Sequence, residues 1–169
     1  MPTHPPQRVL LFAALVSACV ALAAGTAQAS HYSFANISDP SFLTRDEQRQ
    51  LGRAGILDTA TLLKWTASAP RRRWLAQHTT LAPERLELLA TQCDLLRIEG
   101  IGPSVLVVLQ KAGIRDSRTL GRADATELLT HLRSAARGTA MAQKLPQTDT
   151  LATWIRTARR LRPVLDLAD

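Results

Sequence analysis

The stretch of this 169-residue chain best suited to chemistry holds two glycines one residue apart, Arg97-Ile98-Glu99-Gly100-Ile101-Gly102-Pro103-Ser104. Glycine reaches positive φ without steric cost, so this pair predicts a tight hairpin. Pro103 suits the first position of a following helix, where its missing N–H is not needed. Such a helix start presents backbone N–H groups and the positive end of the helix dipole, which can hold a phosphate or another anion.

The candidate nucleic-acid or anion site therefore consists of Gly100, Ile101, Gly102, Ser104 and Lys111. The first helical turn after the hairpin carries no cation, and Lys111 follows only about two turns later. Glu99 also places a carboxylate in the hairpin. Because non-specific DNA affinity rests on neutralised phosphates, this hairpin predicts weak binding. The alternative interpretation is a compact corner in which the glycines allow close helix packing.

Basic residues form two further candidate patches. The chain carries 21 Lys+Arg against 14 Asp+Glu, a net charge of +7 that favours acidic partners. One patch is Arg71, Arg72 and Arg73, beside the possible stacking face of Trp74; the other is Arg156, Arg159 and Arg160. The alternative is that these arginines are solvated helix faces, with Trp65, Trp74 and Trp154 packed in the core.

No catalytic or metal-binding set stands out. The three histidines after the leader are widely separated, and no C-x-x-C or H-x-x-x-H spacing occurs. Cys93 lies on an apolar helical stripe, which predicts a buried, inert thiol. We therefore expect no cofactor, no metal and no catalytic residue, and a protein that is not an enzyme and has no evident small-molecule substrate.

The N-terminal residues 1–29 have the pattern of a secretory signal. A weakly basic start precedes an apolar run, and Ala27-Gln28-Ala29 matches a cleavage site that would leave Ser30 first. The expected location is periplasmic or secreted. The alternative is a lipoprotein, because Val16-Ser17-Ala18-Cys19 resembles a lipidation box; only lipidation of Cys19 would then tie the protein to a membrane.

Helical signals recur through the remainder, with residues 30–42 forming an irregular lead-in. Thr44 to Glu47 has the pattern of a capping box. Helices are expected over about 45–54, 58–64, 68–77, from 83 through Leu96, 103–113, after Asp116, after Asp124, briefly after Gly138, and over about 150–161. Apolar residues at helical spacing mark the inward faces.

An internal repeat supports this organisation. An offset of 58 residues aligns Leu51 with Leu109, Ala54 with Ala112, Gly55 with Gly113, Ile56 with Ile114, Asp58 with Asp116 and Leu62 with Leu120. Each copy contains a helix, a glycine stop, a buried isoleucine, an aspartate cap and a short helix. Only the second copy is preceded by the glycine hairpin.

The chain resembles a bacterial family known only as a domain of unknown function, number 4332. The resemblance rests on the hairpin, on Leu109-x-x-Ala112-Gly113-Ile114, and on the Lys144-Leu145-Pro146 and Trp154-Ile155-x-x-Ala158-x-x-Leu161 elements. It covers roughly 43–164. The family is similar to tandem helix-hairpin-helix modules, so the resemblance implies an all-α bundle over 43–169, with two such units closed by a C-terminal helix. Modules of that class bind DNA without sequence preference, through backbone N–H groups.

Two functions follow as hypotheses. The first is an exported, non-enzymatic interaction or scaffold module that binds a protein partner. The second is weak, sequence-independent DNA binding through the hairpin backbone, since a basic domain favours nucleic acid.

Overall fold

The computed structural model describes residues 31–37 and 42–167, so the expected signal segment, its cleavage site and Cys19 lie outside the described residues. The described chain is all-helical and has no β-strand. Its elements are η1 (Phe34–Asn36), α1 (Arg45–Arg53), α2 (Thr59–Thr66), α3 (Ala69–His78), α4 (Pro83–Leu95), α5 (Pro103–Lys111), α6 (Ser117–Arg122), α7 (Ala125–Ala135), η2 (Ala140–Gln143) and α8 (Thr148–Arg160). The predicted fold class is thus confirmed.

Local sequence signals explain where these helices begin. Asp58, Asp116 and Asp124 each accept hydrogen bonds from backbone N–H groups two or three residues later and cap α2, α6 and α7. Prolines occupy the first turns of α3, α4 and α5. Gly55 and Gly113 follow α1 and α5 with φ of +76° and +89°, values that favour glycine.

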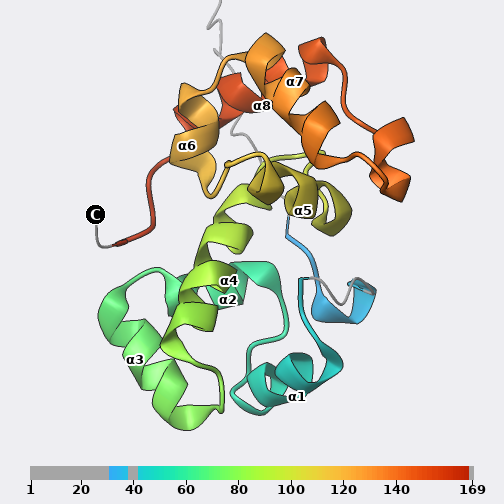
Figure 1. Ribbon diagram of the computed structural model, residues 1–169. Helices are drawn as coiled ribbons and strands as arrows, with labels where there is room; N and C mark the ends of the chain where they lie inside the picture. Colours follow the sequence, from blue (N-terminus) through green and yellow to red (C-terminus); the bar gives the residue numbers. More distant parts are fainter. Residues whose placement is uncertain (1–30, 38–41, 168–169) are drawn as a thin grey trace, which may run out of the picture.

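The helices form two packed groups related by the repeat. In one group α4 packs against α2 and α3, and in the other α8 packs against α6 and α7. Figure 1 shows α1 to α4 in the lower half of the view and α5 to α8 in the upper half, with α4 rising toward α5. We call these groups unit 1 (45–95) and unit 2 (103–160).

The repeat includes helices beyond those aligned by the 58-residue offset. The buried face of α4 reappears 65 residues later in α8, pairing Leu86 with Leu151, Leu89 with Trp154, Ala90 with Ile155 and Cys93 with Ala158. The offset grows from 58 because the α7–α8 connection contains η2. The last helix is thus the counterpart of α4, in addition to closing the bundle.

Residues 31–37 cover one end of unit 1. Ser33 and Asp58 form an isolated antiparallel bridge, and Phe34 and Ile37 are buried. Thr59, the first residue of α2, donates its backbone N–H to Tyr32 O. No helix within 31–37 and 42–167 combines the length and apolar character needed to span a membrane.

Helix α1 is joined to α4 through its capping box. The Thr44 hydroxyl accepts from Glu47 N–H, and the Glu47 carboxylate accepts from Thr44 N–H at 2.8 Å, as predicted. Arg85 on α4 donates its Nε to the same carboxylate at 2.6 Å. Burial alone would raise the pKa of Glu47, but the hydrogen bonds from Arg85 and Thr44 outweigh it and lower this pKa below its ordinary 4.5.

This lowered pKa predicts a pH-dependent contribution of Glu47 to stability. A carboxyl whose pKa is lowered on folding stabilises the protein above its unfolded pKa, and the contribution disappears as the pH falls through the folded pKa. Glu47→Gln should therefore destabilise the protein at neutral pH, and the difference from wild type should shrink below pH 4.5. Urea unfolding at a series of pH values would measure it. The exposed Glu99→Gln is the matched control, and an equal pH trend in both variants would contradict the prediction.

Candidate functional site

Only one of the two hairpin glycines has a backbone conformation that favours glycine. Gly100 has φ of +86°, and a Cβ there would lie 3.0 Å from Nε1 of Trp154. Gly102 is the N-cap of α5 with φ of −100°, and a Cβ there would meet no atom within 4 Å. The expectation that both glycines serve the turn through positive φ is therefore wrong for Gly102. The hairpin packs through Gly100 against α8.

Ile101, in the middle of the hairpin, has both of its backbone polar groups paired inside the protein. Ile101 is buried, its N–H donates to Ile98 O at 3.1 Å, and its carbonyl accepts from the Tyr32 hydroxyl at 3.1 Å. Burial raises the pKa of Tyr32, which keeps this phenol protonated as a donor. The N–H of Ile101 thus has an internal acceptor, and the geometry favours the compact-corner interpretation.

The remaining residues of the predicted hairpin site lie along α5. Ser104 and Lys111 border a hollow between α5 and η2, together with Lys144. Lys111 is the last residue of α5, about 10 Å along the helix axis from its first turn. The structure therefore brings Ser104 and Lys111 to one hollow but separates Lys111 from Gly100.

The three consecutive arginines of α3 do not form one exposed patch. Arg72 is buried and donates to Thr66 O at 2.8 Å and to Asp166 O at 2.9 Å. Arg71 is exposed and donates to Lys64 O, and Arg73 is exposed. The patch prediction is thus corrected for Arg72, which holds the C-terminal residues against unit 1.

Trp74 also differs from its predicted place in the core, since its side chain is 42% exposed. It stacks with Trp65 at a centroid distance of 4.9 Å and with His78 at 3.9 Å, both nearly parallel. These two stacks occupy ring surface of Trp74 that a nucleic-acid base would need for stacking. Trp154, by contrast, is buried as expected.

The burial of Arg72 leads to a stability prediction. Arg72→Met keeps much of the buried stem but removes the guanidinium donors, leaving two carbonyls without their partner. We expect a loss of about 2 kcal/mol of unfolding free energy. Hydrogen exchange at Asp166, whose N–H donates to Ala67 O, should also accelerate. Arg73→Met on the exposed side is the control; similar losses for both variants would refute the role of Arg72.

The second predicted patch lies where α8 meets α6. Arg159 donates its Nε to Gly121 O at 2.7 Å, and Arg156 and Arg160 are exposed one helical turn apart. Two arginines of α6 that the sequence does not single out, Arg118 and Arg122, line one pocket together with Arg159. We call the five the α6–α8 arginine surface: Arg118, Arg122, Arg156, Arg159 and Arg160. None takes part in the four ion pairs of the described residues.

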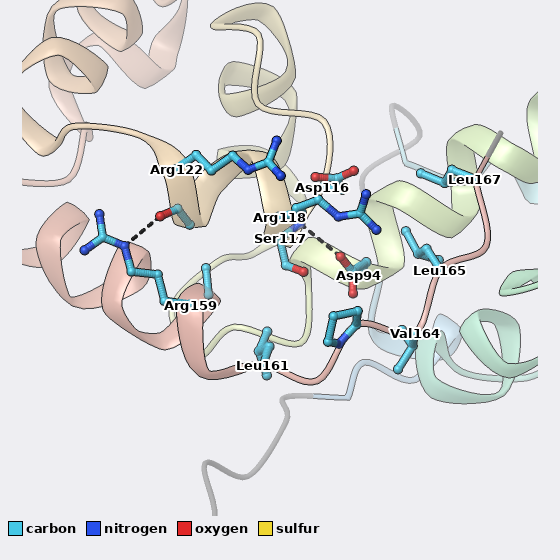
Figure 2. Close-up of a pocket in the computed structure, with 13 residues that line it drawn as sticks. Asp94, Asp116, Ser117, Arg118, Arg122, Arg159, Leu161, Val164, Leu165 and Leu167 are labelled. Atoms are coloured by element: carbon cyan, nitrogen blue, oxygen red, sulfur yellow. Dashed lines mark hydrogen bonds between the residues drawn. The ribbon is translucent and has the colours of Figure 1, made fainter. Parts of the chain in front are cut away.

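A half-open pocket of about 230 Å³ adjoins this surface, and we call it the junction pocket. Arg118 and Arg122 of α6 contribute its cationic groups, whereas Arg159 of α8 lines it but directs its guanidinium to Gly121 O, away from the strap (Figure 2). Residues 161–167, the C-terminal strap, supply most of its apolar wall. Figure 2 shows Arg118 and Arg122 on α6, and Val164 and Leu165 on the strap. The pocket thus combines positive charge with hydrocarbon surface.

Asp94 forms the polar floor of the junction pocket and joins the two units. It is 3% exposed, and its carboxylate accepts from Arg97 Nη1 at 2.7 Å and from Ser117 N–H at 2.9 Å. Arg97 in turn donates to Arg162 O, where the strap begins. The charge of Asp94 is therefore balanced by Arg97.

Position 159 in α8 is the repeat counterpart of Asp94 in α4, 65 residues later. Asp94 binds the N–H of Ser117 at the start of α6, and Arg159 binds the carbonyl of Gly121 near its end. A Cβ at Gly121 would lie 3.4 Å from Arg159, so glycine allows the close approach of α6 and α8. These contacts fix α6 and hence position Arg118 and Arg122.

The thiol and the acidic residues show no further site. Cys93 is 1% exposed, as predicted, and burial followed by the charges of Asp94 and Asp58 raises the pKa of its thiol. Within 31–37 and 42–167 no group of three or more His, Cys, Asp or Glu side chains is placed to hold a metal ion.

Comparison with known proteins identifies the family. No curated protein and no solved structure gave a match. Residues 42–161 match the family described as "Domain of unknown function (DUF4332)" and include every α-helix of both units. The helix-hairpin-helix character of the units stays a prediction. With the greater part of its length matched, the chain belongs to this family of domains of unknown function.

Proposed function

We propose that the protein is an exported, non-catalytic interaction module that binds an acidic protein partner through the α6–α8 arginine surface. The observation that carries the proposal is that two packed helices, α6 and α8, carry five exposed arginines outside the ion pairs of the described chain. Guanidinium groups are suited to carboxylate recognition because they donate several hydrogen bonds in a planar arrangement. The internal pairing of the Ile101 backbone and the packing of Gly100 against Trp154 favour this surface over the hairpin.

The binding part of the proposal is tested by charge reversal at the two arginines outside the junction pocket. Arg156→Glu/Arg160→Glu and wild type are compared as baits in an envelope extract, with Arg53→Glu/Arg73→Glu as the matched control elsewhere. We expect wild type and control to capture the same acidic protein, and the first variant to lose it. Capture should weaken as salt is raised. No reproducible partner, or equal capture by all three baits, would defeat the proposal.

Double-stranded DNA is the second candidate partner, favoured by the same five arginines. Fluorescence anisotropy with a short labelled duplex at low salt separates the candidates. The acidic-protein proposal expects little binding. Tight binding that falls steeply with salt and is lost in Arg156→Glu/Arg160→Glu would instead assign the surface to phosphate contacts.

The export part of the proposal rests on the pattern of residues 1–29. N-terminal sequencing of the protein from the envelope fraction should find Ser30 as the first residue. A Cys19-dependent label from a fatty-acid analogue would instead show a lipid anchor. Recovery of the intact chain, Met1 included, from the cytoplasm would refute export.

A further inference from the structure

We infer that the junction pocket is a binding site for a small amphipathic carboxylate, a hydrocarbon chain that ends in one carboxylate group. This ligand site rests on the proposed function in one respect: both use the α6–α8 arginine surface, since Arg118, Arg122 and Arg159 line the pocket as well. It adds a ligand class and a second, enclosed place of binding on the same face.

The charges around the pocket favour a monoanion. Two arginines of α6, Arg118 and Arg122, face the carboxylates of Asp94 and Asp116 across its lining, while the Arg159 guanidinium is directed to Gly121 O. Asp94 is paired with Arg97, so its charge is balanced from outside the lining. Asp116 accepts from the N–H and the hydroxyl of Thr119 as the cap of α6. A positive excess therefore remains, beside which a ligand carboxylate would accept charge-assisted hydrogen bonds.

The opposite wall favours a hydrocarbon chain. It is formed by the strap residues Leu161, Val164, Leu165 and Leu167 together with Ala158 of α8. Figure 2 shows Val164, Leu165 and Leu167 following one another along the strap. Val164 is 39% exposed in the described structure, and a ligand chain lying against it would remove apolar surface from water.

The size of the pocket limits the ligand. Its volume of about 230 Å³ is smaller than the roughly 300–1,000 Å³ of sites for drug-sized molecules. A medium-length chain fits this space better than a long acyl chain. Octanoate is therefore the probe of choice.

The wall is held in place by contacts with unit 1 and with Arg97 of the hairpin that follows it. Arg97 binds Arg162 O at the start of the strap, and Arg72 binds Asp166 O near its end. Asp166 also donates its N–H to Ala67 O at 2.8 Å. The hydrocarbon side of the site is thus fixed by unit 1 and the hairpin after it, while its cationic side belongs to unit 2.

Titration calorimetry with octanoate on the whole protein tests the inference. Wild type should bind saturably at one site, and Arg118→Gln/Arg122→Gln should weaken binding about tenfold or more, because it removes charge-assisted bonds. Arg53→Gln/Arg73→Gln removes two exposed arginines from unit 1 and should bind like wild type. Acetate, which lacks the chain, and octylammonium, which reverses the charge, should bind far more weakly. Thermal unfolding of every variant checks that the fold is kept.

Three results would overturn the inference: no saturable octanoate binding, equal binding by the Arg118/Arg122 variant, or equal binding of octylammonium. A failure of octanoate to bind is distinguishable from a failure of the proposed function. Protein capture that depends on Arg156 and Arg160 would survive without octanoate binding, and octanoate binding would survive without a protein partner.

Discussion

Asp94→Ala is expected to lower the free energy of unfolding by about 3–5 kcal/mol, the range for breaking a buried ion pair by removing one partner. The substitution leaves Arg97 without its carboxylate, although the Arg97 side chain is only 13% exposed. It also removes the acceptor of Ser117 N–H at the buried start of α6. Both losses occur where the two units meet.

Chemical denaturation of wild type and variant measures this effect. Asp124→Ala is the control, because Asp124 also accepts backbone N–H groups at a helix start but is exposed. It should cost about 1 kcal/mol. The double variant Asp94→Ala/Arg97→Met should recover part of the loss, since neither charge is then buried alone. An Asp94→Ala loss no greater than that of Asp124→Ala would show that this pair does not hold the units together.

The elements of the fold could be predicted from the sequence because their signals are local. Aspartate caps, early prolines and glycine stops lie within a few residues of the helix ends that they determine. The apolar stripes of α4 and α8 also lie within single helices, and their burial followed the 3.6-residue period. These predictions needed no knowledge of which helices meet.

Arg72 and Trp74 show where local reasoning fails. Arg72 is buried because the strap returns to unit 1, and its acceptor Asp166 is 94 residues away in sequence. Trp74 is exposed and stacks with Trp65 and His78. The i,i+4 spacing of Trp74 and His78 within α3 is a local signal, but the contacts of Arg72 with the strap and of Trp74 with Trp65 of α2 have none.

The junction pocket was missed for a related reason, although one signal could have led to it. Arg118 and Arg122 reach the pocket only because α6 packs against α8. Extending the repeat to the 65-residue offset would have paired α8 with α4, and so placed α6 beside α8 as α2 lies beside α4. At the same offset the strap corresponds to the hairpin segment 96–102 but lacks its glycines, so the repeat does not predict the conformation of the strap.

Serine substitutions at Gly55, Gly100 and Gly102 should separate the two reasons why position 100 favours glycine. These are its positive φ and the close approach of the Trp154 ring. Gly55→Ser tests positive φ alone, because Gly55 has φ of +76° and open space around it, and should cost about 1 kcal/mol. Gly102→Ser meets neither a positive φ nor a neighbour within 4 Å, and serine is a favoured N-cap. It should leave stability unchanged or slightly increased.

Gly100→Ser should cost about 2–4 kcal/mol, because it combines the positive-φ penalty with a contact at the Trp154 indole that the buried ring cannot easily relieve. Denaturant midpoints of the three variants, together with the near-ultraviolet circular dichroism of Trp154, measure the order of the effects. Equal losses of stability at Gly100 and Gly102 would mean that the contact with Trp154 adds nothing to the cost of the substitution. A loss confined to Gly100 would mean that the hairpin is built to bring unit 2's last helix against the end of α4, so that its glycines serve packing ahead of any ligand.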